Sequence, residues 1–77
     1  MPKKYHIELS ALDLGQLLDG LEARAAAWEK TASYHRTGES PADFMVEECS
    51  DAEEADRIAA HYRSIIAQIF EQREAQA

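Results

Sequence analysis

The chain has 77 residues, enough for one domain near the size at which a folded monomer buries only about 60% of its unfolded-chain surface. Cys49 is the single cysteine, which excludes an intramolecular disulfide. No signal peptide and no apolar run of membrane-spanning length is found in the sequence. These features predict a soluble protein of the reducing cytoplasm that is stabilised by self-association rather than by cross-links.

Charge is distributed unevenly along the chain. Fifteen acidic residues oppose eight basic ones, for a formal net charge of −7. Between Arg36 and Arg57 there is no Lys or Arg, and this stretch carries −8 while the remainder carries +1. Because like charges repel, the balance argues against binding to nucleic acid or to a membrane and favours a basic partner surface. The acids of the stretch are Glu39, Asp43, Glu47, Glu48, Asp51, Glu53, Glu54 and Asp56.

Apolar and polar side chains alternate over residues 4–9. Tyr5, Ile7 and Leu9 fall on one side of an extended chain, whereas His6 and Glu8 fall on the other. A period of two residues is typical of a strand with one buried face. The sequence therefore predicts a short N-terminal strand over residues 4–9.

A long helix is predicted to follow, over residues 11–36. Ser10 with Asp13 three residues later is a variant of the helix-start signature, with Asp in place of Glu or Gln. Gly38 suits a left-handed helix end. Between these signals, apolar residues recur at alternating intervals of four and three: Leu14, Leu18, Leu21, Ala25, Trp28 and Ala32. This heptad spacing predicts an apolar stripe in which Trp28 packs in the core.

Residues 37–49 are predicted to form a connector, because Gly38 and Pro41 interrupt regular structure. The apolar run Phe44-Met45-Val46 inside the connector needs a surface to cover.

A second helix is predicted over residues 51–74. Ser50-x-x-Glu53 matches a complete capping box at its start, and the acids of the first turn complement the helix dipole. The stripe repeats the earlier spacing in Ala55, Ala59, Tyr62, Ile66, Ile69 and Arg73.

Together these segments predict a mainly α fold in a single domain, residues 1–77, with the two helices folded back as an antiparallel hairpin. A hairpin alone leaves one side of each stripe exposed, so a second copy is expected to complete a four-helix bundle as a homodimer. The strand and the connector flank a helix about 40 Å long, so they can meet only across an antiparallel dimer.

Two interpretations of the acidic stretch remain open. In the first, the acids form a solvated face that keeps a small protein soluble. In the second, the carboxylates imitate phosphates and bind a basic groove. A DNA strand presents a charge about every 3.4 Å, and carboxylates on adjacent helical turns lie about 5–6 Å apart. Most of these acids fall at the start of the second helix, where one platform can present them together.

An enzymatic interpretation is weaker. Helical NTP pyrophosphatases of the MazG kind carry Glu-x-x-Glu and Glu-x-x-Asp on neighbouring helices and hold magnesium with the four carboxylates. Asp19-x-x-Glu22 and Glu53-x-x-Asp56 resemble this pattern only in part, since Asp replaces the first Glu and both pairs flank the apolar stripes. A magnesium cluster needs carboxylates that converge on one point. The chain is therefore predicted not to be an enzyme, and no cofactor is expected.

Cys49 and His61 could form a thiolate–imidazole pair, but no oxyanion donors or Gly-rich turn lie near them in the sequence. A small apolar plug or an inert thiol is the simpler interpretation of Cys49. His6, His35 and His61 do not fall at metal-ligand spacing within the chain. No metal site is predicted, although a metal that bridges two chains stays open.

The sequence also resembles the small helical proteins of bacterial prophages and other mobile elements. The residues that carry this resemblance run from Leu17-Leu18-Asp19 through Trp28-x-x-Thr31-Ala32, Thr37-Gly38-Glu39 and Val46-Glu47-Glu48-Cys49-Ser50-Asp51-Ala52 to Ile58-Ala59-x-His61-Tyr62. Anti-CRISPR inhibitors recur among short acidic proteins of this type, and some imitate DNA. The resemblance implies such an inhibitor, acting in the cytosol of a bacterium or other host cell.

The working hypothesis is a non-enzymatic inhibitor whose acidic residues, Asp43 among them, dock on a Lys/Arg-lined nucleic-acid channel of a protein partner. The competing hypothesis is a structural or adaptor homodimer that binds a protein through Phe44, Met45 and Val46 of the connector. Salt dependence separates the two, because only the charged contact weakens steeply with ionic strength.

Overall fold

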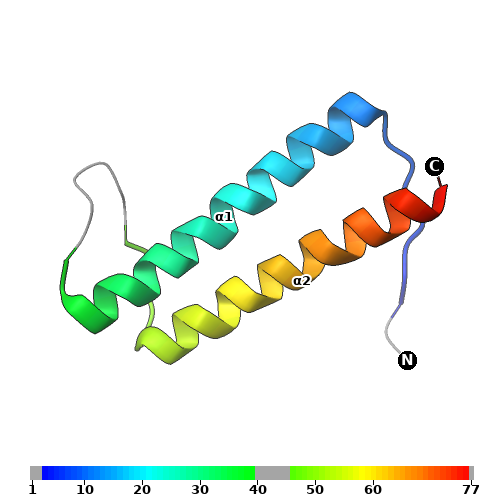
Figure 1. Ribbon diagram of the computed structural model, residues 1–77. Coiled ribbons are helices and arrows are strands. Elements are labelled where there is room, and N and C mark those ends of the chain that lie inside the picture. The colour runs from blue at the N-terminus through cyan, green and yellow to red at the C-terminus, as the bar shows by residue number, and fades with distance from the viewer. Residues whose placement is uncertain (1–2, 40–45, 77) are drawn as a thin grey trace.

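The computed structural model describes residues 3–39 and 46–76, which contain two α-helices packed as an antiparallel hairpin (Figure 1). Helix α1 comprises Ala11–Thr37 and helix α2 comprises Ala52–Gln76. The predicted helical hairpin is confirmed, and each predicted helix boundary lies within two residues of the observed one. We call the end with the start of α1 and the end of α2 the open end, and the opposite end the connector end.

Both ends of α1 have the predicted caps. The hydroxyl of Ser10 accepts a 3.0 Å hydrogen bond from the N–H of Asp13, which satisfies one of the unpaired donors of the first turn. Gly38 adopts φ 76°, and its N–H donates to the carbonyl of Tyr34 at 2.7 Å. This left-handed conformation explains why glycine ends the helix.

The cap of α2 is shifted by one residue from the predicted capping box, and the helix begins at Ala52. The carboxylate of Asp51, not the hydroxyl of Ser50, accepts the N–H of Glu54 at 2.8 Å. The side chain of Glu54, not of Glu53, accepts the N–H of Ser50 at 2.8 Å. The prediction was wrong by one position because a carboxylate is the stronger acceptor and its charge complements the helix N-terminus.

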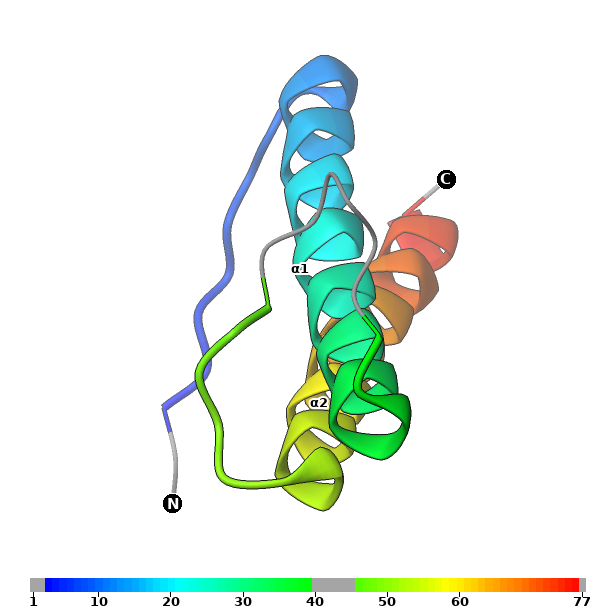
Figure 2. The same cartoon turned by 90° about the vertical axis from the view of Figure 1, so that its left-hand side faces the viewer.

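The predicted N-terminal strand is wrong. Residues 3–10 are extended, but the described residues contain no strand, because the hairpin offers no sheet edge with which this segment could pair. The connector cannot supply one either, since it lies at the far end of α1 (Figure 1). Tyr5 and Ile7 remain 79% and 73% exposed. Figure 2 shows the N-terminal segment and the described residues before α2, 46–51, on the same side of α1.

The core lies along the contact between the helices, and the size of its side chains differs between the two ends. Near the connector it contains Trp28 with three small residues, Ala32, Ala55 and Ala59. Toward the open end it contains Leu18, Ala25 and Ile66, packed against half-buried larger side chains. Small residues let the helix backbones approach closely, whereas leucine and isoleucine hold them apart. The helices accordingly splay toward the open end (Figures 1 and 2).

No helix in the described part of the chain is both long and apolar enough to span a lipid bilayer.

Candidate functional site

The structure places the acidic stretch at the connector end, where three elements meet (Figure 1). Glu39 follows α1, Glu47 and Glu48 belong to the connector, and Asp51 precedes α2. Glu53, Glu54 and Asp56 lie in the first two turns of α2. Asp43, the remaining predicted contact residue, lies outside the described residues. The candidate site is therefore one end of the hairpin rather than a cleft.

Glu47 fastens the connector to α1. Its carboxylate accepts a 2.7 Å hydrogen bond from Arg24, and its backbone N–H donates to Oγ1 of Thr31 at 3.0 Å. The Arg24 guanidinium carbon also lies 5.9 Å from the ring centroids of both Trp28 and Tyr62. Cation–π contact therefore holds Arg24 across both helices, in the position from which it binds Glu47.

Asp56 pairs with an arginine from the other helix. The guanidinium of Arg36, in the last turn of α1, binds the Asp56 carboxylate through both terminal nitrogens. Hydrogen bonding to Arg36, together with its charge, lowers the pKa of Asp56 below the ordinary aspartate value. This pair joins the end of α1 to the start of α2, so Asp56 has a structural role.

Asp51 and Glu54 also have structural roles, because they form the N-terminal cap of α2 described above. Four of the predicted contact residues thus stabilise the fold, namely Glu47, Asp51, Glu54 and Asp56. Glu47 and Asp56 are moreover neutralised by Arg24 and Arg36, which precede the acidic stretch in the sequence.

Three predicted contact residues have a different environment. Glu39, Glu48 and Glu53 are exposed and lie outside the ion pairs of the described residues. Their carboxylates come from the end of α1, the connector and the first turn of α2. Asp51 and Asp56 are exposed as well. Among the described acids of the stretch, Glu39, Glu48 and Glu53 therefore differ in being exposed without an ion pair or a helix cap.

A second ion-pair network crosses the hairpin at its middle. Arg63 of α2 donates to Glu22 at 2.5 Å and to Glu29 at 3.1 and 2.8 Å, both on α1. Arg63 lowers the pKa of Glu29, mainly through these hydrogen bonds. This network was not predicted from the sequence. The available signal was the spacing of Glu22 and Glu29, which lie seven residues apart and therefore on the same face of α1.

The enzymatic alternatives can be compared with this geometry. Glu22 and Asp56, one residue from each partial MazG-like pair, bind arginines. Among residues 3–39 and 46–76, no group of three or more His, Cys, Asp and Glu side chains is arranged to hold a metal ion.

Cys49 contacts His35 rather than His61. Its Sγ lies 3.3 Å from Nε2 of His35, and it packs against the cluster around Trp28. Burial raises the pKa of the Cys49 thiol, and the negative charges of Glu54 and Asp51 raise it further. A nucleophilic cysteine needs the opposite shift. This geometry fits the interpretation of Cys49 as a packing residue.

Comparison with known proteins gives no relative: no family model matches the chain, and neither a curated protein nor a solved structure matches it significantly.

Proposed function

We propose that this chain is a non-enzymatic inhibitor or binding protein whose connector end docks on a basic, nucleic-acid-binding surface of another protein. The observation that carries the proposal is the segregation of charge, with eight acids and no base between Arg36 and Arg57. Three of these acids, Glu39, Glu48 and Glu53, are exposed outside the ion pairs of the described residues.

The structural acids support the exposed ones. Glu47 ties the connector to α1, Asp56 ties the two helices together, and Asp51 caps α2. The exposed carboxylates therefore project from a preorganised scaffold, which lowers the entropic cost of binding. A surface of one sign also steers an oppositely charged partner during encounter.

The partner to test first follows from the resemblance to acidic proteins of mobile elements. A CRISPR effector complex offers a Lys/Arg-lined channel for DNA, and a chain bound there would exclude the DNA. In this proposal the protein acts in the cytosol of a bacterium or other host cell, without a cofactor and without touching nucleic acid itself.

The experiment measures inhibition of DNA binding by purified, guide-loaded CRISPR effector complexes, with fluorescent target DNA as the probe. The test variant combines Glu39→Gln, Glu48→Gln and Glu53→Gln. The matched control combines Asp19→Asn, Glu71→Gln and Glu74→Gln, which remove the same charge from exposed positions away from the connector end. Glu47 and Glu54 are left intact, because their substitution would also remove the connector contact or the helix cap.

We expect the wild type to compete with DNA, the test variant to lose roughly tenfold or more in affinity, and the control to retain it. Competition should weaken as salt rises. Equal inhibition by the test variant, or no inhibition by the wild type across effector types, would contradict the proposal.

The second candidate is a small structural or adaptor homodimer that binds a protein through the connector. Val46 is half-buried, whereas Phe44 and Met45 lie outside the described residues. The observation that favours a homodimer is the set of exposed apolar side chains at the open end, among them Ile7 of the N-terminal segment and Leu12 of α1. A binding affinity that does not change with salt concentration but is lost in Phe44→Ala would support this candidate instead.

A further inference from the structure

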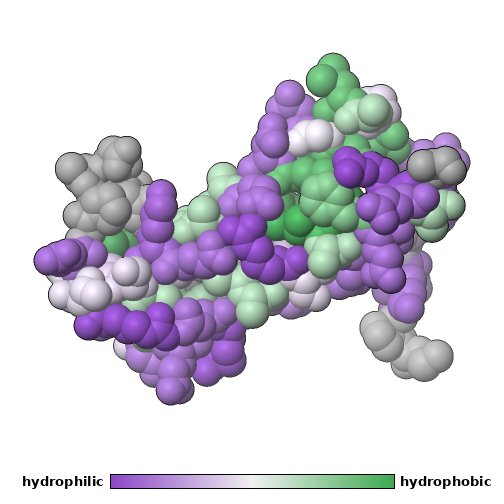
Figure 3. Space-filling model, in the orientation of Figure 1, coloured by the Kyte–Doolittle hydropathy of each residue, from purple (hydrophilic) through white to green (hydrophobic). Residues whose placement is uncertain are grey.

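The open end of the hairpin carries an apolar groove that the chain leaves uncovered. The groove has a volume of about 740 Å³, and its lining includes Leu14 and Leu17 of α1, Ile69 of α2, and Tyr5, Ile7 and Leu9 of the N-terminal segment. Figure 3 shows apolar residues gathered at this end, where α1 begins. Leu14 and Ile69 are half-buried against the core cluster of Leu18, Ala25 and Ile66, so the groove lies directly above this end of the core.

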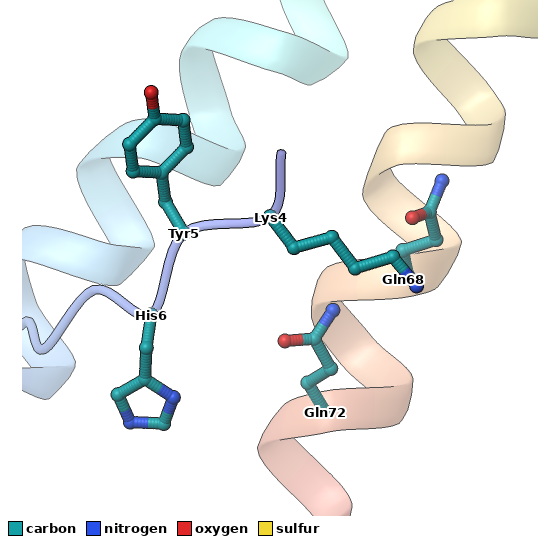
Figure 4. Close-up of a pocket in the computed structure, with 5 residues that line it drawn as sticks. All are labelled: Lys4, Tyr5, His6, Gln68 and Gln72. Atoms are coloured by element: carbon teal, nitrogen blue, oxygen red, sulfur yellow. The ribbon is translucent and has the colours of Figure 1, made fainter. Parts of the chain in front are cut away.

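The N-terminal segment forms one wall of the groove without sealing it. Figure 4 shows Tyr5 and His6 projecting to opposite sides of the segment, and Lys4 reaching toward Gln68 of α2. Tyr5, Ile7 and Leu9 share one side, and all three stay exposed. An alternating segment that leaves its apolar side in water is suited to cover a further surface.

The surface of the chain is too large for a compact monomer. A folded monomer of 8.7 kDa is expected to expose about 4,700 Å², whereas this chain exposes 6213 Å². The radius of gyration is 15.0 Å, against about 11.5 Å for a compact domain of this length. The excess surface, about 1,500 Å², exceeds the roughly 800 Å² that each partner buries in a standard stable interface.

The charges around the groove allow two identical chains to approach there. In residues 3–19, Lys3 and Lys4 nearly offset Glu8, Asp13 and Asp19. Arg63 pairs with Glu22 and Glu29 at the middle of the hairpin, so in residues 64–76 Arg73 offsets only one of Glu71 and Glu74. The open end thus carries a small net negative charge, while the connector end holds most of the negative charge and would repel its own copy.

From the excess surface, the apolar groove and the low local charge, we infer that the open-end groove binds a second copy of this chain. Each copy places Tyr5, Ile7 and Leu17 against the corresponding surface of the other in a two-fold interface. The four helices then share an apolar centre, and both acidic ends point away from it. This inference concerns the opposite end of the molecule from the proposed function and does not depend on it.

Sedimentation velocity and light scattering of the purified chain, from about 1 to 200 μM, test the inference. The test variants are Leu17→Glu and Ile7→Glu, which place a charge in the groove. The matched control is Leu12→Glu, since Leu12 also lies in the first turns of α1, is 74% exposed and does not line the groove. Circular dichroism of each variant verifies that the helices are retained.

We expect the wild type and Leu12→Glu to sediment at twice the 8.7 kDa chain mass. The groove variants should raise the dissociation constant roughly tenfold or more, because each replaces an apolar contact with a carboxylate that must lose its water on association. A wild type that stays monomeric throughout, or a dimer unaffected by both groove variants, would overturn the inference. If Leu17→Glu loses helicity, Ile7→Glu still decides, since Ile7 lies outside both helices and is 73% exposed.

Discussion

The backbone N–H of Glu47 donates a 3.0 Å hydrogen bond to Oγ1 of Thr31, sixteen residues earlier in the chain. Thr31 is fully buried, and its hydroxyl also donates to the carbonyl of Ala27 at 2.8 Å. This hydroxyl therefore joins the connector to α1 at Glu47, beside the ion pair that the Glu47 carboxylate forms with Arg24. The first prediction follows from this contact.

Thr31→Val keeps the volume of the side chain but removes the hydroxyl. We expect the free energy of unfolding to fall by about 1–2 kcal/mol, because the N–H of Glu47 loses its acceptor in a partly buried position. Urea unfolding followed by circular dichroism measures the loss. Ser33→Ala, at an exposed position of the same helix, should change stability by less than about 0.5 kcal/mol. An equal effect of both substitutions would show that the connector contact contributes nothing.

Ala55 is fully buried in the connector-end core, together with Trp28, Ala32 and Ala59. Ala55→Leu adds volume that cannot be accommodated there, and should destabilise the hairpin by about 1–3 kcal/mol. Ala60→Leu makes the same change at an exposed position of α2 and is expected to be nearly neutral. Thermal unfolding of the two variants compares them directly. Equal melting temperatures would mean that the helices can separate at this point without cost.

Two glycines of α1 should respond to alanine in opposite directions. Gly38 has φ 76°, so Gly38→Ala forces a left-handed conformation and should cost about 1 kcal/mol. Gly20 lies inside the helix, and a Cβ built there meets nothing within 4 Å. Gly20→Ala should therefore stabilise the protein by about 0.5–1 kcal/mol. Chemical denaturation of both variants measures whether each substitution raises or lowers the free energy of unfolding. A stabilising Gly38→Ala would contradict the left-handed cap.

The Arg36–Asp56 pair predicts a pH dependence. Because the pKa of Asp56 is lower in the folded state than its ordinary value of 3.8, ionised Asp56 contributes stability above that value. The contribution is lost as the pH falls through the folded-state pKa. Wild type should therefore be slightly more stable than Asp56→Asn at pH 7, and the difference should shrink progressively as the pH falls below 3.8.

Urea midpoints from neutral pH down to about pH 3 measure this difference. Glu48→Gln is the control, since Glu48 lies at the same end of the molecule but outside the observed ion pairs. The stability of Glu48→Gln measures how much the protein gains when one negative charge is removed and repulsion among the remaining acids decreases. A profile of Asp56→Asn that parallels that of Glu48→Gln would show that the Arg36 contact is not maintained in solution.

Local signals in the sequence were sufficient to predict both helices. Ser10 and Gly38 mark the ends of α1 through hydrogen bonds within four residues, and heptad spacing places Trp28 in the core. The strand prediction failed because alternating apolar and polar side chains show only that a segment suits a strand. A strand also needs a neighbouring strand for hydrogen bonding, and the helical hairpin provides none. The cap of α2 was misplaced because neighbouring Ser50 and Asp51 compete for the same role, and only the geometry shows which one wins.

By itself, the sequence determined the helical hairpin and the concentration of acidic residues in one segment, because periodicity, caps and charge counts depend on neighbouring positions. Only the tertiary structure decided which acids form ion pairs or helix caps within the fold and which do not. Arg24 and Arg36 lie outside the acidic segment in sequence, yet the antiparallel packing brings them to Glu47 and Asp56. It likewise decided that the helices splay into an apolar groove, because the distance between helix axes depends on which side chains of both helices meet.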